Sequence, residues 1–301
     1  MNQPGSNVVV TGGAGFLGSH VVDVLVDRGH RVTVFDTHES SFEREGVEYV
    51  TGDIQDTEAV RAACEGASAV FHLAALADLN AAKTRPRDTV EINIGGTINV
   101  LEAVREFGIQ RLMFASTVYV YSREGGFYRC SKQACEGYIE EYRQKYGVEY
   151  TVLRYGSLYG PRSDASNGVY RLIHGAMTEG RVRHGGGPED VREYIHVQDA
   201  ARLSVDALAD GFANERIVIT GNDALRFRDL ITMLSEILGS DVAVEYPDAA
   251  SGARSGHYSM TPYAFEPKLG RKLTTPHYVD MGQGLLQVMQ EIHAVSSKAT
   301  Q

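Results

Sequence analysis

Hydrophobic positions recur along the first half of the chain in two different patterns. Short runs rich in Val, Ile and aromatic residues predict buried strands. These runs cover residues 7–11, 31–36, 47–50, 68–73, 111–115 and 149–154. Between them, apolar residues at three- and four-residue spacings predict amphipathic helices, most clearly over residues 88–107. This alternation predicts an α/β fold, a doubly wound parallel sheet with helices on both faces.

The alternation of predicted strands and helices becomes less regular after Pro161. Glycine-rich segments at 156–168 and 185–188 interrupt it, as expected where loops form a ligand-binding lobe. Later patterns predict strands at 216–220 and 242–246 and helices at 227–238 and 281–294. We therefore predict a sheet domain over residues 1–160, completed by later segments. A smaller lobe, interleaved with it, is expected mainly from residues 161–301.

Charge and composition narrow the possible partners. The net charge of -10 repels nucleic-acid backbones and anionic membranes, so any phosphate must be bound locally. The chain has neither a leader-like N-terminal segment nor an apolar run of eighteen residues, which favours a cytoplasmic protein. Cys64, Cys130 and Cys135 lack the spacing of a disulfide framework or a zinc site. We expect no nucleic acid, no membrane and no metal among its partners.

The segment Thr11–Gly18 reads TGGAGFLG, between a Val-rich strand and a predicted helix. Its glycines match the G-x-G-x-x-G pattern, in which a tight turn and a helix N-terminus bind a pyrophosphate. Asp36 ends the next predicted strand, where a carboxylate binds an adenosine ribose and repels a 2′-phosphate. The combination predicts a Rossmann-type domain that binds NAD. The expected contacts from these segments are Gly12, Gly15, Phe16, Leu17, Gly18 and Asp36.

Tyr128 and Lys132 lie four residues apart on a predicted helix, so both side chains project from one face. Taken alone, this spacing would indicate an ordinary surface pair. However, the preceding strand ends at Thr117, at the carboxyl edge where doubly wound sheets bind ligands. A lysine ammonium and a positively charged nicotinamide together would lower the pKa of a nearby phenol. We therefore predict that Tyr128 is a proton acceptor, assisted by Lys132, and that Thr117 positions the reacting oxygen.

Taken together, these motifs make the chain similar to the extended short-chain dehydrogenase/reductase family, especially its nucleotide-sugar epimerases and dehydratases. The similarity also covers Gly52-Asp53-Ile54, HLAA (72–75), NIGGTINVLEA (93–103), LRYGSLYGPR (153–162) and VREYIHVQDAA (191–201). It implies further NAD contacts from Asp53, Ile54, Leu73, Ala74, Ala75, Asn93, Lys132 and Tyr155. It also implies substrate contacts from Thr117, Ser157 and Arg192, with Arg192 on the diphosphate. A homodimer formed through residues 88–107 and 130–146 is expected as well.

Departures from the family pattern reduce the number of activities that we expect. Family dehydratases carry acidic residues shortly after the catalytic Ser/Thr, whereas Val118 and Tyr119 follow Thr117 here. We therefore expect a nucleotide-sugar 4-epimerase that works through a transient 4-keto sugar. A nucleotide-sugar oxidoreductase or dehydratase, or a non-catalytic NAD-binding regulator, remains an alternative. Ser157 replaces a family Asn, and the segment between Tyr121 and Tyr128 is short, so the sugar itself stays open. Arg254, His257 and Tyr258 are weaker candidates for nucleotide contacts.

Overall fold

A computed structural model of the chain describes residues 5–246 and 259–262. The strands are β1 (Asn7–Thr11), β2 (Arg31–Asp36), β3 (Glu48–Thr51), β4 (Ala69–His72), β5 (Arg111–Thr117), β6 (Tyr150–Tyr155), β7 (Ser157–Tyr159), β8 (Arg181–Arg183), β9 (Val191–His196), β10 (Glu215–Ile219), β11 (Ala224–Arg226) and β12 (Ala243–Glu245). The α-helices are α1 (Phe16–Asp27), α2 (Thr57–Cys64), α3 (Leu79–Thr84), α4 (Pro86–Asp88), α5 (Gly96–Glu106), α6 (Gly126–Tyr146), α7 (Gly168–Glu179), α8 (Val197–Asp206) and α9 (Phe227–Leu238). A π-helix, η1 (Thr89–Gly95), and two 3₁₀ helices, η2 (Val118–Tyr121) and η3 (Asp210–Phe212), complete these elements. The predicted helix at 281–294 and the candidates Arg254, His257 and Tyr258 lie outside the described residues.

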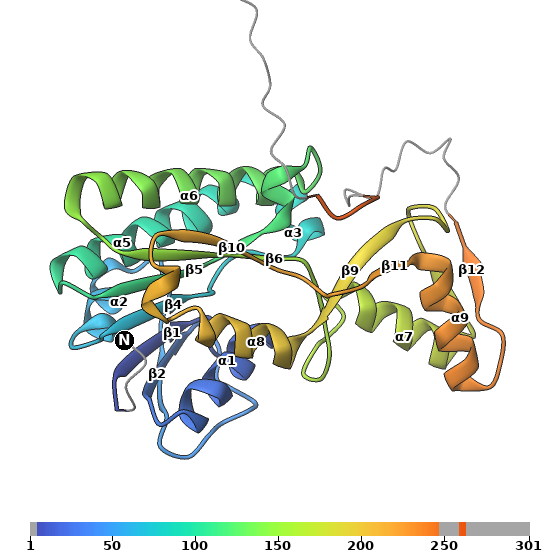
Figure 1. Ribbon diagram of the computed structural model, residues 1–301, viewed down its shortest axis with the longest axis horizontal. Coiled ribbons are helices and arrows are strands. Elements are labelled where there is room, and N and C mark those ends of the chain that lie inside the picture. The colour runs from blue at the N-terminus through green and yellow to red at the C-terminus, as the bar shows by residue number, and fades with distance from the viewer. Residues whose placement is uncertain (1–4, 247–258, 263–301) are drawn as a thin grey trace, which may run out of the picture. The chain divides into compact units, whose positions relative to one another are not determined.

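Seven strands form a parallel sheet in the order β10-β6-β5-β4-β1-β2-β3. Helices α2, α5 and α6 cover one face, and α1 and α8 cover the other (Figure 1). The doubly wound fold predicted from the sequence is confirmed. The edge strand β10 comes from residues 215–219 and pairs with β6, so a late segment completes the sheet.

The apolar runs form central strands because each strand packs on both faces of the sheet. In β1, Val8 and Val10 belong to the core beneath α1 and α8, while Val9 belongs to the core beneath α5 and α6. On α1, Val21 and Leu25 are buried at helical spacing against the first of these cores. The alternation of side chains along a strand thus divides one Val-rich run between two layers.

The predicted helix over residues 88–107 is not uniform. It begins as α4 and the π-helix η1 and becomes α-helical only at Gly96. A Cβ on Gly96 would lie 2.5 Å from Ile54 Cδ1, so glycine allows the helix to approach the segment after β3 closely. The hydroxyl of Thr97 donates to the carbonyl of Asn93 at 2.5 Å within this region. π-Helical turns shift the positions of side chains, and such turns occur often at functional sites.

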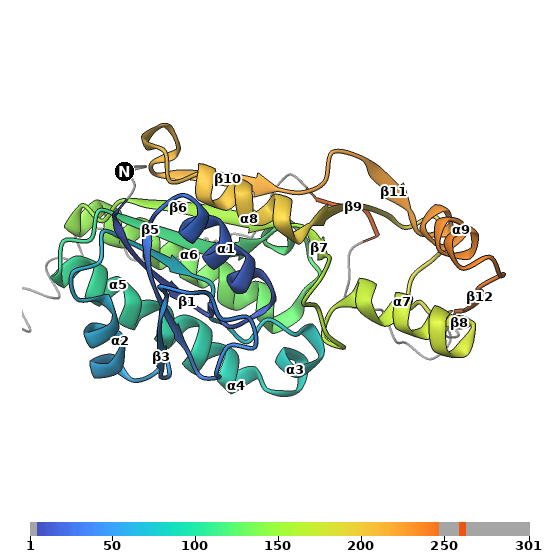
Figure 2. The same cartoon turned by 90° about the horizontal axis from the view of Figure 1, so that it is seen from below.

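A smaller lobe follows β6. Strand β9 pairs in parallel with β7 and antiparallel with β11, and β8 pairs with β12. Helices α7 and α9 lie beside β8 and β12 (Figure 2). The lobe's core is small and consists of Ala176, Val182, Phe227, Ile231 and Val242, with four partly buried aliphatic residues around them. Strand β7 directly follows β6 in the chain and pairs with β9. Strand β9 therefore connects the lobe to the carboxyl edge of the sheet.

Candidate active site

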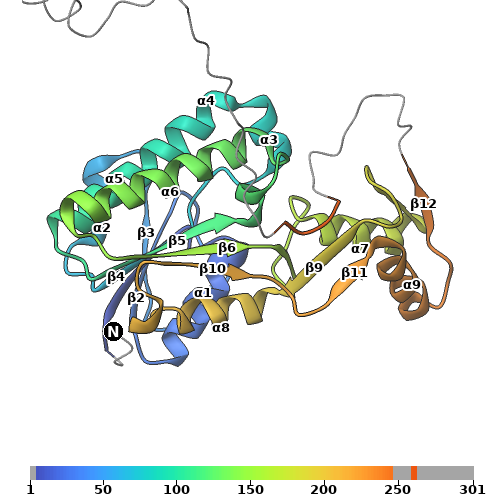
Figure 3. The same cartoon turned by 45° about the horizontal axis from the view of Figure 1, so that its top comes forward.

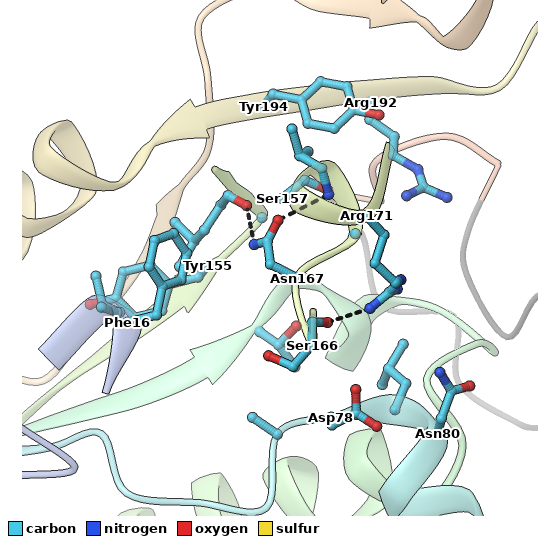
Figure 4. A pocket seen from close by; sticks show the side chains of 18 of the residues that line it. Phe16, Asp78, Asn80, Tyr155, Ser157, Ser166, Asn167, Arg171, Arg192 and Tyr194 are labelled. Atoms are coloured by element: carbon cyan, nitrogen blue, oxygen red, sulfur yellow. Dashed lines mark hydrogen bonds between the residues drawn. The ribbon is translucent and has the colours of Figure 1, made fainter. Parts of the chain in front are cut away.

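The carboxyl ends of the sheet strands and the lobe enclose a cavity of about 960 Å³. Many residues singled out from the sequence line it, namely Gly12, Gly15, Phe16, Leu17, Gly18, Leu73, Ala75, Thr117, Tyr128, Lys132, Tyr155, Ser157 and Arg192. Five others do not belong to the lining: Asp36, Asp53, Ile54, Ala74 and Asn93. Figure 4 shows several of the lining side chains, which come from both the sheet region and the lobe.

The glycine turn after β1 can hold a pyrophosphate. Gly12 has a φ of +74°, and a Cβ there would lie 2.6 Å from the backbone nitrogen of Ala74. A Cβ on Gly18 would lie 2.0 Å from the carbonyl oxygen of Gly12, so the helix packs against the turn itself. Helix α1 has Gly15 as its N-cap, with no side-chain cap. Its first amide groups therefore have no intrahelical acceptor and lie at the cavity, which suits an anion.

Asp36 lies at the end of β2 beside this turn. Its two carboxylate oxygens accept hydrogen bonds from the backbone amides of Ala14, at 3.0 Å, and His38, at 3.2 Å. These bonds fix the carboxylate next to the glycine turn, as a ribose contact of NAD requires. Asp53 accepts from the amide of Gln55 at 2.9 Å on the turn after β3, while Ile54 is buried against Gly96. The contacts of these residues with NAD stay predictions.

The predicted catalytic residues all line the same cavity. Thr117 ends β5, while Tyr128 and Lys132 lie on the first turns of α6. The ammonium of Lys132 donates to the carbonyl of Ala115 at 2.7 Å. Its Nζ atom lies 4.7 Å from the ring centre of Phe114 and 5.9 Å from that of Tyr128. The cavity therefore presents a hydroxyl, a phenol and an ammonium side by side.

Burial dominates the electrostatics of this pair. It lowers the pKa of Lys132 from 10.5 to about 8 and raises the pKa of Tyr128. In the chain by itself, the Lys132 ammonium does not offset the desolvation of the phenol. The pKa shift expected of a catalytic tyrosine therefore needs a further positive charge, which is consistent with the role predicted for the oxidised nicotinamide.

A buried ion pair lies next to the predicted catalytic residues, and it was not predicted from the sequence. Glu136, one turn after Lys132 on α6, pairs with Arg154 of β6 through two hydrogen bonds, of 2.5 and 3.1 Å. Glu136 also accepts from Ser116, at 2.5 Å, and Arg154 donates to Tyr121. Both charged residues are buried, with only 9% of Arg154 and 7% of Glu136 exposed. The pair thus connects α6, β5, β6 and η2. The only sequence signal for this pair was that Glu136 lies four residues after Lys132, on the same face of the helix.

Asn93 forms a buried clasp instead of lining the cavity. Its amide oxygen accepts from the backbone nitrogen of Leu76 at 2.7 Å, and its Nδ2 donates to the Leu76 carbonyl at 3.2 Å. Nδ2 also donates to the hydroxyl of Ser131 at 2.9 Å, and that hydroxyl donates to the carbonyl of Tyr128 at 2.8 Å. Asn93 therefore joins the loop after β4 to the first two turns of α6. Its predicted contact with NAD stays a prediction.

Several lining residues were not predicted from the sequence. They include Asp78, Asn80, Tyr119, Asn167, Arg171, His184 and Tyr194. Asn167 caps α7 by accepting from the amides of Val169 and Tyr170, and it also donates to Leu158. Asn before a helix is a readable cap signal, but the cap alone does not place the residue at a cavity. Of the others, only Asp78 and His184 lie on loops, and the remaining four lie in α3, η2, α7 and β9. Their place at the cavity depends on how these elements pack in the fold.

The fold and the site define a class of protein: an NAD-binding α/β protein with a Tyr-Lys pair at the carboxyl edge of its sheet. Residues 8–220 match the model of the NAD dependent epimerase/dehydratase family. The chain belongs to this family, and NAD is its cofactor.

Curated relatives in this family have more than one activity. A putative UDP-glucose 4-epimerase of Methanocaldococcus jannaschii is 29% identical over 254 residues, covering 77% of this chain and 82% of that protein. A dTDP-glucose 4,6-dehydratase of Mycobacterium tuberculosis is 31% identical over 257 residues, covering 77% of this chain and 76% of that protein.

Solved structures resemble the whole fold. The UDP-glucose 4-epimerase of Thermotoga maritima with UDP-glucose has a TM-score of 0.75 and 30% identity, covering 86% of this chain and 90% of that one. MoeE5 in complex with UDP-glucuronic acid and NAD has a TM-score of 0.77 and 25% identity, with coverages of 86% and 90%. Within the part of the chain that the structure describes, no helix has the length and apolarity needed to span a membrane.

Proposed function

We propose that this protein is a nucleotide-sugar 4-epimerase that uses NAD. The observation that carries the proposal is the convergence of Thr117, Tyr128 and Lys132 on one cavity without an acidic residue directly after Thr117. A dehydratase must also move a proton at a neighbouring carbon, and Val118 and Tyr119 provide no carboxylic acid for that step. Relatives named as 4-epimerases support the same choice.

The residues divide the chemistry between them. NAD, when bound, accepts and returns the hydride of C4 and adds one positive charge to the site. Tyr128 takes the proton from the C4 hydroxyl and returns it later, while Lys132 stabilises the phenolate and Thr117 holds the reacting oxygen. The intermediate 4-keto sugar must rotate within the site, so that hydride returns to its other face. A cavity of about 960 Å³ leaves room for that movement.

Arg192 of β9 is proposed to bind the substrate's diphosphate. The residue lines the cavity at the lobe, and a guanidinium suits such an anion through paired donors. Tyr194, two residues further along β9, lies on the same side of the strand and also lines the cavity (Figure 4). Ser157 pairs with Tyr194 in the small sheet, so the family's substrate segment after β6 adjoins β9. These positions support a substrate bound across the sheet edge and the lobe.

The proposal also includes a homodimer formed through η1, α5 and α6. Large hydrophobic side chains on these helices are exposed, including Val90 at 54%, Tyr138 at 46% and Tyr146 at 45%. Exposed apolar residues gathered on neighbouring helices favour an interface. The mass in solution, measured by light scattering, tests this part, and a monomeric mass at micromolar concentration would contradict it.

The test of the function uses a panel of UDP-, GDP-, CDP- and dTDP-sugars incubated with the purified protein and followed by NMR. We expect a C4 epimer to form without net consumption of NAD. Tyr128→Phe should lower turnover by about 10³-fold or more, since it removes the proton acceptor, while NAD affinity stays nearly constant. A 4-keto-6-deoxy product would identify a dehydratase instead, and stoichiometric release of NADH would identify an oxidoreductase. An undiminished rate for Tyr128→Phe would overturn the assignment.

A further inference from the structure

We propose that Asp78 makes the sugar subsite select an uncharged hexose over a hexuronate. This inference rests on the proposed function, because it takes Thr117 and Tyr128 to mark the reacting end of the sugar. The solved relatives leave the charge of the sugar open, since one contains UDP-glucose and another contains UDP-glucuronic acid. These sugars differ at C6, where a hydroxymethyl group is replaced by a carboxylate.

The backbone places Asp78 beside the catalytic residues. Asp78 lies two residues after Leu76, which the Asn93 clasp joins to Ser131 and thereby to the turn of Tyr128. Helix α3, which Asp78 caps, lies beside the start of α6 (Figures 1 and 3). Asp78 also lines the same cavity as Thr117 and Tyr128. The loop is therefore held at the reacting end by hydrogen bonds on both sides of Leu76.

The carboxylate of Asp78 has no counter-charge. Its Oδ1 accepts from the backbone nitrogen of Ala81 at 2.7 Å, as an N-cap does. Among residues 5–246 and 259–262, it has no ion-pair partner, and Oδ2 accepts no hydrogen bond. Lys132, the cation at this end of the cavity, donates to the carbonyl of Ala115. One carboxylate oxygen thus stays available to a group in the cavity.

Each arginine of the cavity either lies at the far end from Asp78 or is bound to another group. Figure 4 shows Asp78 and Asn80 at one end of the drawn side chains and Arg192 and Tyr194 at the other. Arg171 lies between these two ends in the same view, closer to Asp78 and Asn80, and it donates to the carbonyls of Ala165 and Ser166. The two remaining arginines of the lining, Arg181 and Arg183, both pair with Glu245. Arg192 therefore lies where a diphosphate would bind, and the carboxylate of Asp78, which no cation pairs with in the described residues, lies at the other end.

This polarity favours one class of sugar. A hydroxyl group of an uncharged hexose can donate to Asp78, whereas the carboxylate of a hexuronate would face a like charge. The cations on this side of the cavity, Arg171 and Lys132, already donate to backbone carbonyls. Repulsion of the wrong partner is a common means of specificity. The neutral amide of Asn80 next to it can donate or accept, so it adds no charge to this end.

The experiment compares UDP-glucose and UDP-glucuronic acid on the full-length, NAD-loaded protein. The wild type should prefer UDP-glucose by about 10-fold or more in both kcat/KM and affinity. Asp78→Asn removes the charge but keeps a side-chain oxygen for the helix cap, since Asn and Asp cap equally well. It should reduce that preference by about 10-fold, chiefly through better binding of UDP-glucuronic acid.

Asp56→Asn is the matched control. Asp56 caps α2 by accepting from the amides of Glu58 and Ala59, and it does not line the cavity. This variant changes the net charge and a helix cap in the same way, so its sugar preference should equal that of the wild type. An equal change in both variants would assign the effect to overall charge and overturn the inference.

Other outcomes separate the inference from the proposed function. If neither sugar is converted but the affinity ratio still shifts in Asp78→Asn, the proposed function fails and the charge selection stands. If epimerisation occurs with an unchanged ratio in Asp78→Asn, the proposed function stands and the inference fails. A loss of NAD affinity at a constant sugar ratio would place Asp78 at the cofactor and also overturn the inference.

Discussion

The sheet region and the lobe differ in how firmly they hold the residues that they bring to the cavity. Strand β6 is buried along its whole length, whereas β9 is only half-buried except at Ile195. Two large cores flank the sheet, while five buried residues form the core of the lobe. The proposed proton-transfer residues, Thr117, Tyr128 and Lys132, thus belong to the densely packed region, and Arg192 belongs to the sparsely packed one. Proton transfer needs fixed distances, which a densely packed region provides.

The buried ion pair provides the largest test of this contrast. Glu136→Gln would leave the Arg154 guanidinium buried without its counter-charge, so we expect a loss of about 3 kcal/mol or more in the free energy of unfolding. Glu189→Gln removes a partner of Arg228 in the lobe, where both side chains are more than half exposed, and should cost less than about 0.5 kcal/mol. Urea denaturation of both variants measures the difference. Equal losses would show that the two regions are held alike.

Lys132→Met tests what it costs in stability to place the ammonium of a proposed catalytic residue in the packed region. Burial lowers the pKa of Lys132 from 10.5 to about 8, and each unit corresponds to about 1.4 kcal/mol. Below pH 8 the folded chain carries this buried charge, so Lys132→Met should be more stable than the wild type by about 1–3 kcal/mol, although it should be inactive.

The stability difference between Lys132→Met and the wild type should depend on pH. Between pH 8 and 10.5 the unfolded chain binds the proton more tightly, so the wild type gains stability as the pH rises. The advantage of Lys132→Met should therefore disappear near pH 10.5. Lys83→Met, at an exposed position of α3, should show no such dependence. An advantage that is independent of pH would contradict the assigned cause.

Conservative core substitutions should give the smallest difference. Ile139 of α6 is fully buried against the sheet, and Ile231 of α9 is 8% exposed in the lobe. Ile→Val removes one methylene and costs about 0.5–1.5 kcal/mol, depending on how far the surroundings relax. We expect Ile139→Val near the upper limit and Ile231→Val near the lower, as measured by thermal denaturation. The reverse order would mean that the lobe is packed as rigidly as the sheet.

The sequence predicted the sheet region far better than the lobe. All six strands expected in the first half are present within two residues, and helix α9 spans residues 227–238 as expected. These elements carry strong periodic patterns, because strands buried on both faces require continuous apolar runs. Strands β7, β8 and β11 have only three residues each, too few for a period to be recognised. The π-helical turn before Gly96 also escaped prediction, since the apolar spacing over residues 88–107 does not distinguish a π-helix from an α-helix.

Tyr128 and Lys132 show what the sequence by itself determined about the site. Helical spacing places their side chains on one face, and a glycine turn between a strand and a helix specifies an anion site, because both depend on short-range backbone geometry. Only the tertiary structure decided that Glu136 meets Arg154, that Asn93 joins Leu76 to Ser131, and that Asp78 faces the same cavity as Tyr128. These residues are distant in the chain, and the packing of whole helices and strands against each other brings them together. The burial that shifts the pKa values of Tyr128 and Lys132 has the same origin.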